Sequence, residues 1–410
     1  MSRRSSELAV ALLATAVARV IVLTLGLYDF WDTSFVSHIV QDLRTWHDFF
    51  LKTRSGLTPY VDFSKEYPVG AGMLYWAMAR FVDPEDLRQT VFVHGLAMGA
   101  IDLVNTALAY RLFREKSPDR ALAFTLLFSL NFTTLLLSPI RFESALVLLV
   151  LLGYGAAAKG RPFQAVAFWS VGFWMKWLPA FFMAAQEWRA LFVDRIAWRW
   201  LRAAGVFVAV AVLMNGPFVW AAWRHGSLGL LMAPWKFHME RPLYWDTLLG
   251  VGQIWLGPLP WERYGSWWTL GLVTLALAAR PRLRLEYKGV LLCIAAILFN
   301  RIYSAQFHLW FYPFLLLGMI TEGEERRRQI LSLAVALDVL NVIVFPLSFT
   351  LCLDEIGGFY PYAARANGGP WTVIFSGAIV LRAVALVVLA ALLLTTGDAD
   401  ASMGRRRLRG

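Results

Sequence analysis

The chain has 410 residues, of which 58% are hydrophobic and only 16% are charged, and its mean hydropathy is +0.54. Charged residues approach a quarter of a soluble domain, so this composition excludes a soluble globular protein and indicates a multi-pass membrane protein. The formal net charge of +11 comes mainly from short basic clusters between apolar runs. That pattern is typical of positive-inside topology rather than of nucleic-acid binding.

The first apolar run follows Arg3 and Arg4 and continues to about residue 27, which is longer than the apolar part of a signal peptide. We therefore predict a signal anchor whose N-terminus is cytoplasmic. The basic clusters predict the other cytoplasmic segments, so the polar segments between them should lie on the outer side. The clusters occupy residues 3–4, 111–120, 159–161, 189–202, 280–288, 326–328 and 405–409. The outer segments are 28–66, 138–142, 223–265, 300–307 and 349–370.

Apolar runs of about the length needed to cross a bilayer predict ten membrane spans. The spans are 7–27, 91–113, 121–137, 143–158, 203–222, 266–280, 289–303, 308–320, 328–348 and 371–396. Residues 163–188 have Lys176 and Pro179 at their centre and basic residues on both sides, so we expect two short helices that turn back within the membrane. The predicted fold is an all-α, polytopic transmembrane helical bundle. It forms a single integral membrane domain over residues 1–410, with a basic cytoplasmic tail at 397–410.

The first outer loop, residues 28–82, mixes carboxylates with aromatic residues, a combination suited to holding a sugar. Within it, residues 35–52 place apolar side chains such as Leu43 and Trp46 at helical spacing, with Asp42 on the opposite face. This pattern predicts a helix that lies in the membrane interface. Residues 67–81 are too close to the next span to cross independently, so we expect a second juxtamembrane or re-entrant helix there.

Two sequence blocks in this loop resemble glycosyltransferase family 87, whose members are polytopic GT-C-type enzymes that use polyprenyl-phosphate sugars. The blocks are D-L-R-T-W at 42–46 and G-L-T-P-Y-V-D-F-S-K-E-Y-P at 56–68. Weaker matches follow in the family's order, and the resemblance therefore spans most of the chain. They are R-F-E at 141–143, K-W-L-P at 176–179, H-M-E-R-P-L-Y-W-D-T at 238–247 and N-R-I-Y-S-A-Q-F-H-L-W at 300–310. The resemblance implies a GT-C-type fold.

The chemistry and the resemblance both favour Asp42 as the catalytic base. An acceptor hydroxyl must lose its proton as it attacks the anomeric carbon of the sugar, and one positioned carboxylate can take that proton. On the polar face of an interfacial helix, Asp42 would lie at the depth of a lipid-phosphate headgroup. The alternative from spacing alone is a solvated surface charge.

The leaving group would be a phosphate on a lipid, so the site needs cations at the interface rather than an acid. The candidates are Arg241, Lys236, Arg301 and His308. Each of them could instead be an interfacial anchor. Lys176 lies beside the predicted helix break and could also reach the phosphate. His238 and Gln306 lie in the matching blocks, and the resemblance implies that they bind substrate.

Three further carboxylates are candidates for substrate binding. Glu66 and Asp62 could orient hydroxyl groups of the sugar or acceptor, or could instead hold the loop backbone through hydrogen bonds. For Asp62 we favour the structural role, in which it holds the loop backbone. Glu143 could bind substrate, or it could pair with the neighbouring Arg141.

One pair of charged residues and the aromatic residues can each be interpreted in more than one way. Asp338 and Arg382 lie in apolar runs, where they should face protein or a polar cavity, and they could form a buried pair between the last two spans. Most tryptophans and tyrosines should form interfacial belts. Trp46, Tyr60 and Trp310 could instead stack on a sugar ring.

The predicted function is that of an inverting hexosyltransferase in the plasma membrane. It would move one sugar, mannose by resemblance, from a polyprenyl-phosphate donor to a lipid or glycan acceptor on the outer face, with both termini cytoplasmic. No metal or other cofactor is predicted, because the D-x-D at Asp398 and Asp400 lies in the predicted tail and no Gly-rich phosphate loop occurs. The alternatives are a transporter or flippase of lipid-linked sugars, and a scaffold. Transporters often have two equivalent halves, whereas the polar segments here gather on one side, which favours an enzyme.

Overall fold

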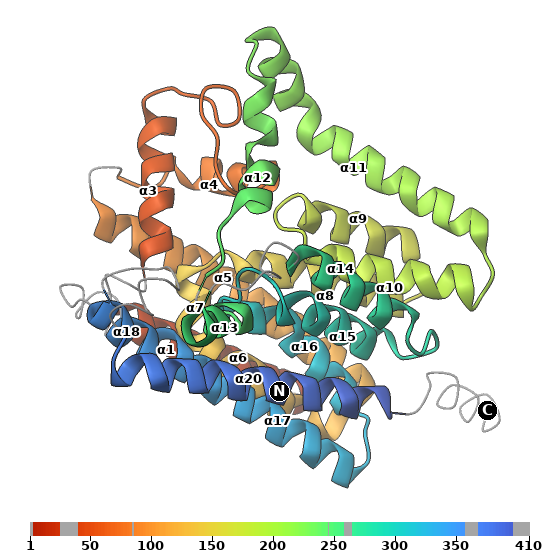
Figure 1. Ribbon diagram of the computed structural model, residues 1–410. Coiled ribbons are helices and arrows are strands. Elements are labelled where there is room, and N and C mark those ends of the chain that lie inside the picture. Colours follow the sequence, from red (N-terminus) through yellow and green to blue (C-terminus); the bar gives the residue numbers. More distant parts are fainter. Residues whose placement is uncertain are drawn as a thin grey trace. The chain divides into compact units, whose positions relative to one another are not determined.

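The computed structural model describes residues 3–24, 40–83, 86–244, 246–257, 265–356 and 368–396. All regular secondary structure in these ranges is helical, and β pairing is limited there to an isolated bridge between Pro59 and Phe63 (Figure 1). The predicted all-α class is therefore confirmed. Residues 28–39 of the predicted outer loop and the predicted tail at 397–410 lie outside the described residues.

Five helices in the described part of the chain are long and apolar enough to cross a membrane. They are Arg3–Thr24, Leu87–Lys116, Ala197–Arg224, Glu324–Leu353 and Pro370–Leu394. Helices of this kind satisfy every backbone polar group internally, which lipid requires. They indicate a helical membrane protein, and each of them coincides with one of the predicted spans.

The other five predicted spans correspond to shorter or broken helices, so the number of ten spans stays a prediction. α8 (Glu143–Ala158) and α14 (Gly265–Ala278) are apolar but short. α15 (Leu285–Leu298) and α16 (His308–Met319) also fall below the roughly 20 residues of a straight span.

The predicted span at 121–137 is formed by two helices rather than one straight helix, because the chain bends by 48° at Asn131. α6 (Ala121–Leu130) ends there and α7 (Phe132–Leu137) begins. The Asn131 side chain accepts a hydrogen bond from the Thr134 amide at 2.9 Å and donates one to the Phe128 carbonyl at 2.7 Å. These bonds replace backbone bonds of a continuous helix, which is how asparagine caps a helix start.

Contacts within the chain group it into two compact units. The first comprises Met1–Glu115, Ala121–Met183 and Trp198–Arg241, and the second comprises Lys116–Arg120, Ala184–Ala197 and Pro242–Gly410. The first unit contains α1 (Arg3–Ile21), α3 (Gln41–Arg54), α4 (Val69–Met78), α5 (Leu87–Lys116), α6, α7, η3 (Ser138–Ile140), α8, α9 (Pro162–Phe173), α11 (Ala197–Arg224), α12 (Leu228–Glu240) and the start of α10 (Pro179–Phe192).

A buried ion pair fastens the first helix of the first unit. Arg19 of α1 donates to the Asp102 carboxylate of α5 at 2.8 Å and to the Ser129 carbonyl of α6 at 3.2 Å. Ionic side chains within apolar helices are found paired and facing protein, as they are here. The contact therefore fixes α1 against two neighbouring helices.

The loop between α3 and α4 folds around Tyr60. The Tyr60 hydroxyl donates to the carbonyls of Tyr67 at 2.8 Å and Pro68 at 3.0 Å, and the residue is only 1% exposed. Its ring fills the space beside Gly72 of α4, where a Cβ atom would lie 2.4 Å from the ring. Much of the sequence block at 56–68 thus supports the start of α4.

We expect Gly72→Ala to lower the free energy of unfolding by about 1–3 kcal/mol, because the added methyl overpacks the contact with Tyr60. The matched control is Gly205→Ala in α11, where no atom lies within 4 Å of the added methyl. There the higher helix propensity of alanine should leave stability unchanged or slightly raised. Thermal unfolding of the purified protein checks this, and equal behaviour of the two variants would contradict it.

The second unit contains two of the five long apolar helices together with shorter ones. It contains η2 (Pro118–Arg120), the end of α10, α13 (Leu248–Leu256), α14, α15, η5 (Ala305–Phe307), α16, α17 (Glu324–Val342), η6 (Ile343–Ser348), α18 (Phe349–Ile356) and α20 (Pro370–Leu394). Apolar side chains of α13, α18 and α20, with Val344 of η6, pack into a common core.

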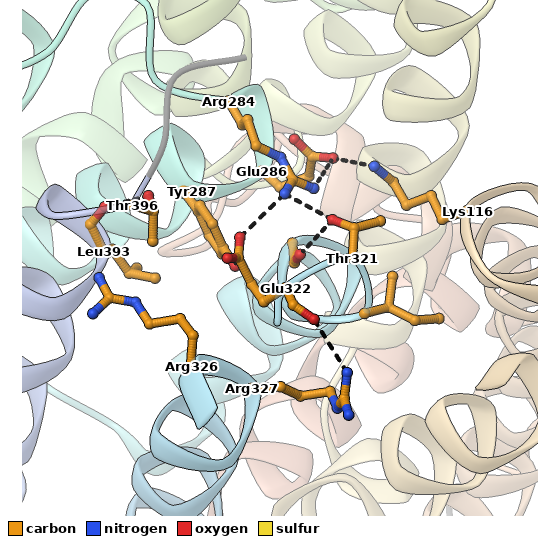
Figure 2. A network of polar contacts seen from close by, with 12 residues as sticks. Lys116, Arg284, Glu286, Tyr287, Thr321, Glu322, Arg326, Arg327, Leu393 and Thr396 are labelled. Carbon is orange, nitrogen blue, oxygen red and sulfur yellow. Dashed lines mark hydrogen bonds and ion pairs between the residues drawn. The ribbon is translucent and has the colours of Figure 1, made fainter. Parts of the chain in front are cut away.

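Charged side chains of the second unit form an ionic network (Figure 2). Arg284 donates to the Thr321 hydroxyl at 2.8 Å and to the Glu322 carboxylate at 3.3 Å. Lys116 pairs with Glu286 at 2.5 Å. Arg284 also lies 3.4 Å from Glu286, so this carboxylate joins Lys116 and Arg284, which come from two different predicted cytoplasmic clusters.

Candidate functional site

A helix is present where the sequence predicts one: α3 begins at Gln41 and carries Asp42 in its first turn. Leu43, Trp46 and Phe50 are buried, whereas Asp48 is exposed and pairs with Lys52 at 3.0 Å. The predicted division into apolar and polar faces is therefore confirmed for residues 42–52. Residues 35–39 lie outside the described part.

A column of stacked rings sets the orientation of α3. Trp46 stacks on Tyr75 of α4 with ring centroids 3.5 Å apart, and the Tyr75 hydroxyl lies 3.0 Å from His94 Nε2. His94 Nδ1 lies 2.9 Å from the Pro139 carbonyl, which can only accept, so Nδ1 carries the proton and Tyr75 donates to Nε2. These contacts fix α3, α4 and α5 against one another next to Asp42.

The aromatic residues considered for stacking on a sugar are core residues. Trp46 is 2% exposed, and Tyr60 and Trp310 are each 1% exposed. No ring face of these residues is open to a ligand. That hypothesis is wrong for all three.

Asp42 forms an ion pair with Arg141, which lies between η3 and α8. The Asp42 side chain is 43% exposed, whereas the Arg141 side chain is only 10% exposed. The contact is made through Asp42 Oδ2 and a terminal guanidinium nitrogen. The arginine therefore anchors the carboxylate from within the protein and leaves it open to solvent.

Glu143, two residues further on, is fully buried and pairs with Lys176 at 2.6 Å. The predicted pairing of Glu143 with Arg141 is therefore wrong, because each of the two charges has another partner. The second carboxylate oxygen, Oε2, is buried and has no hydrogen-bond partner among the described residues. A buried acceptor of this kind costs about 1–3 kcal/mol unless a water or a ligand donates to it.

Lys176 reaches this position because the predicted helix break is present. α9 ends at Phe173 and α10 begins at Pro179, with proline at the first helical position, where it is favoured. The Trp174 carbonyl in the break accepts a hydrogen bond from the Gly70 amide of α4 at 2.7 Å. This bond brings the loop before α4 to Lys176, whose ammonium lies 5.4 Å from the Tyr67 ring centre.

Glu66 and His238 have pKa values shifted by their surroundings. Burial raises the pKa of Glu66, and the charge of Asp42 adds to this shift, while Lys65 and Arg241 oppose it. Burial lowers the pKa of His238 to about 4, and nearby cationic side chains act in the same direction. The His238 ring also contacts the Glu66 backbone through a hydrogen bond. At neutral pH the histidine is therefore neutral, between the Glu66 backbone and the positive charges of Arg241 and Lys176.

The first unit thus brings together six of the predicted site residues. They are Asp42, Glu66, Glu143, Lys176, His238 and Arg241. Two other predicted residues lie elsewhere in that unit: Asp62 accepts from the Thr58 amide at 2.7 Å and holds the loop, as favoured, while Lys236 is exposed and lies 3.9 Å from Glu240.

Three predicted residues belong to the second unit. Gln306 and His308 are buried there, and the Arg301 carbonyl accepts from the Tyr244 amide at 2.9 Å. The His308 ring packs on Tyr312 with centroids 4.8 Å apart. Arg382 is also buried in this unit. It donates to Asn341 Oδ1 at 3.2 Å instead of pairing with the Asp338 carboxylate, as the sequence predicts.

Sequence reasoning missed Arg141 as a site residue. Its signal was present in the R-F-E block at 141–143. Residues two positions apart at the start of a helix point in different directions. Arg141 therefore pairs with Asp42, whereas Glu143 pairs with Lys176.

The pKa of His238 gives a prediction for acid stability. A histidine whose pKa falls from 6.5 to about 4 on folding contributes stability above pH 6.5, and this contribution is lost as the pH falls toward 4. For His238→Gln, the loss of unfolding free energy between pH 7.5 and 5 should be smaller than in the wild type by about 1–2 kcal/mol. The control is His225→Gln, because His225 is exposed. Thermal unfolding at both pH values checks this, and parallel behaviour of the variants would contradict it.

The cluster combines an accessible carboxylate with several cations and buried hydrogen-bond acceptors. Asp42 can take a proton from a ligand, and Lys176 and Arg241 can hold an anionic group. Within the described residues, no three His, Cys, Asp or Glu side chains lie where they could hold a metal ion. No family model matches the chain, and no curated protein matches it.

Proposed function

We propose that this protein is an inverting membrane glycosyltransferase that moves a sugar from a polyprenyl-phosphate donor to a hydroxyl group of a lipid or glycan acceptor. The observation that carries the proposal is the Asp42 carboxylate, 43% exposed and bound to a buried arginine. A general base must be positioned and yet reachable by the acceptor, and this carboxylate meets both conditions.

The reaction is a single displacement. The acceptor oxygen attacks the anomeric carbon of the sugar while Asp42 takes the hydroxyl proton. The bond from that carbon to the phosphate oxygen breaks, and the lipid phosphate leaves with the electron pair. Attack from the face opposite the phosphate inverts the configuration at the anomeric carbon.

The charged neighbours of Asp42 suit the two substrates. Lys176 and Arg241 supply positive charge for the departing phosphate, which needs no protonation. Glu143 Oε2, buried and without a donor among the described residues, would accept a hydrogen bond from a sugar or acceptor hydroxyl. From the resemblance, mannose is the transferred sugar.

The proposal includes a GT-C-type architecture with about ten spans in the plasma membrane and the site on the outer face. We expect a reporter fused after residue 55 to report the outer side, and one fused after residue 285 to report the cytoplasm. Expression of paired periplasmic-active and cytoplasm-active reporters at both positions checks this orientation. Both positions on one side would contradict it.

The function is tested with purified full-length protein and radiolabelled sugar on polyprenyl phosphate, with membrane lipid and glycan extracts as acceptors. The label should move to an acceptor, and a nucleotide sugar carrying the same label should not replace the donor. Transfer from the nucleotide sugar alone, or movement of intact labelled donor across vesicle membranes without transfer, would reject the proposal. The second outcome would instead favour a flippase.

A further inference from the structure

An open cavity of about 240 Å³ lies in the first unit, lined by residues of α5, α8 and α9. It is separate from the candidate site. The site contains Glu143 at the start of α8, whereas the cavity touches Ala156 and Lys159 at its end. With a helical rise of 1.5 Å per residue, these ends lie about 20 Å apart.

The cavity has an apolar wall and a cationic rim. The apolar wall is formed by Leu108, Leu152 and Phe168, and the cationic rim by Arg111, Lys159 and Arg161. One lining residue, Glu115, carries the opposite charge. The three rim residues are exposed, and none of them forms an ion pair with a described residue. The rim therefore presents an excess of positive charge next to an apolar surface.

The start of α9 adds to this positive field. α9 begins at Pro162, and the residues of its first turn have no earlier helical carbonyl to bind. Gln164 of that turn lines the cavity. A helix N-terminus attracts anions through its free amides and its dipole, here in addition to three basic side chains.

We propose that this cavity binds an anionic membrane phospholipid, with its phosphate on the cationic rim and an acyl chain along the apolar wall. The rim residues come from the basic clusters at 111–120 and 159–161, which the charge pattern assigns to the cytoplasmic side. Anionic lipids populate that leaflet and are recognised by basic pockets between helices. A free phosphate would satisfy the rim but leave the apolar wall uncovered.

The test is native mass spectrometry of the full-length protein, exchanged into equal amounts of phosphatidylglycerol and phosphatidylcholine. The wild type should retain phosphatidylglycerol over phosphatidylcholine by at least about tenfold, because each basic residue near an anionic lipid contributes to binding. The variant Arg111→Gln, Lys159→Gln, Arg161→Gln should lose this preference. Its exposed side chains make no ion pair with a described residue, so the fold should persist.

The control removes the same charge at Arg4, Arg195 and Arg282, which are exposed and lie in other basic clusters. This control triple variant, each arginine changed to glutamine, should keep the preference of the wild type. Equal loss in both variants, or no preference in the wild type, would overturn the proposal. Displacement by glycerol phosphate as readily as by the whole lipid would also overturn it, because the acyl chain would then contribute nothing. The measurement needs no sugar transfer, so its outcome is independent of the proposed catalytic function.

Discussion

Asp42→Asn is expected to lower sugar transfer by about a thousandfold, within the range that general base catalysis contributes. Asparagine has nearly the same shape as aspartate and retains an oxygen that can accept from Arg141. It cannot take up the acceptor proton. Initial rates of label transfer from the polyprenyl-phosphate donor, measured with the purified variant, check this expectation.

The matched control for this experiment is Asp48→Asn. Asp48 lies on the same helix and is exposed, but its partner is Lys52. A surface pair of this kind is worth little, so transfer should stay near the wild-type rate. Transfer by Asp42→Asn within a few-fold of Asp48→Asn would show that residue 42 is a surface charge and not the base.

Removing one partner of the buried Glu143–Lys176 pair is expected to lower the free energy of unfolding by about 3–5 kcal/mol. Both side chains are almost completely buried, at 0% and 6% exposure, and they lie 2.6 Å apart. Either single variant, Glu143→Gln or Lys176→Met, leaves the other charge in the interior without compensation. Thermal unfolding of the purified protein measures the loss.

The double variant separates the structural role of the pair from its functional role. With both charges removed, stability should recover most of the loss, since an apolar or neutral replacement of a buried pair is often tolerated. Sugar transfer should stay low, because the cation near the departing phosphate is absent. Recovery of transfer together with stability would show that the pair only supports the fold.

Several elements could be predicted from the sequence because their signals are local. Proline at residue 179 and the interrupted apolar pattern before it predict the break between α9 and α10. The helical spacing of apolar residues in 41–52 predicts α3 and its buried face. In each case the local structure is determined by residues that are close together in the sequence. The sequence pattern therefore predicts it correctly.

Other features could not be predicted because they depend on contacts between distant segments. Asn131 bends the predicted span at 121–137, yet the same residue could equally well face a polar neighbour in a straight helix. α12 and α13 are too short for their apolar residues to signal a span. Arg141 pairs with Asp42, and Glu143 pairs with Lys176, because of how α3, α4 and α8 pack. The spacing of residues in the sequence does not specify this packing.

The role of Asp42 as a base is tested most directly by adding azide to the transfer reaction. Azide is already an anion and needs no base, so it should restore consumption of the polyprenyl-phosphate sugar by Asp42→Asn and form a glycosyl azide of inverted configuration. It should not accelerate Asp48→Asn or the wild type. If azide leaves Asp42→Asn as slow as before, or speeds all three proteins alike, Asp42 does not take the acceptor proton.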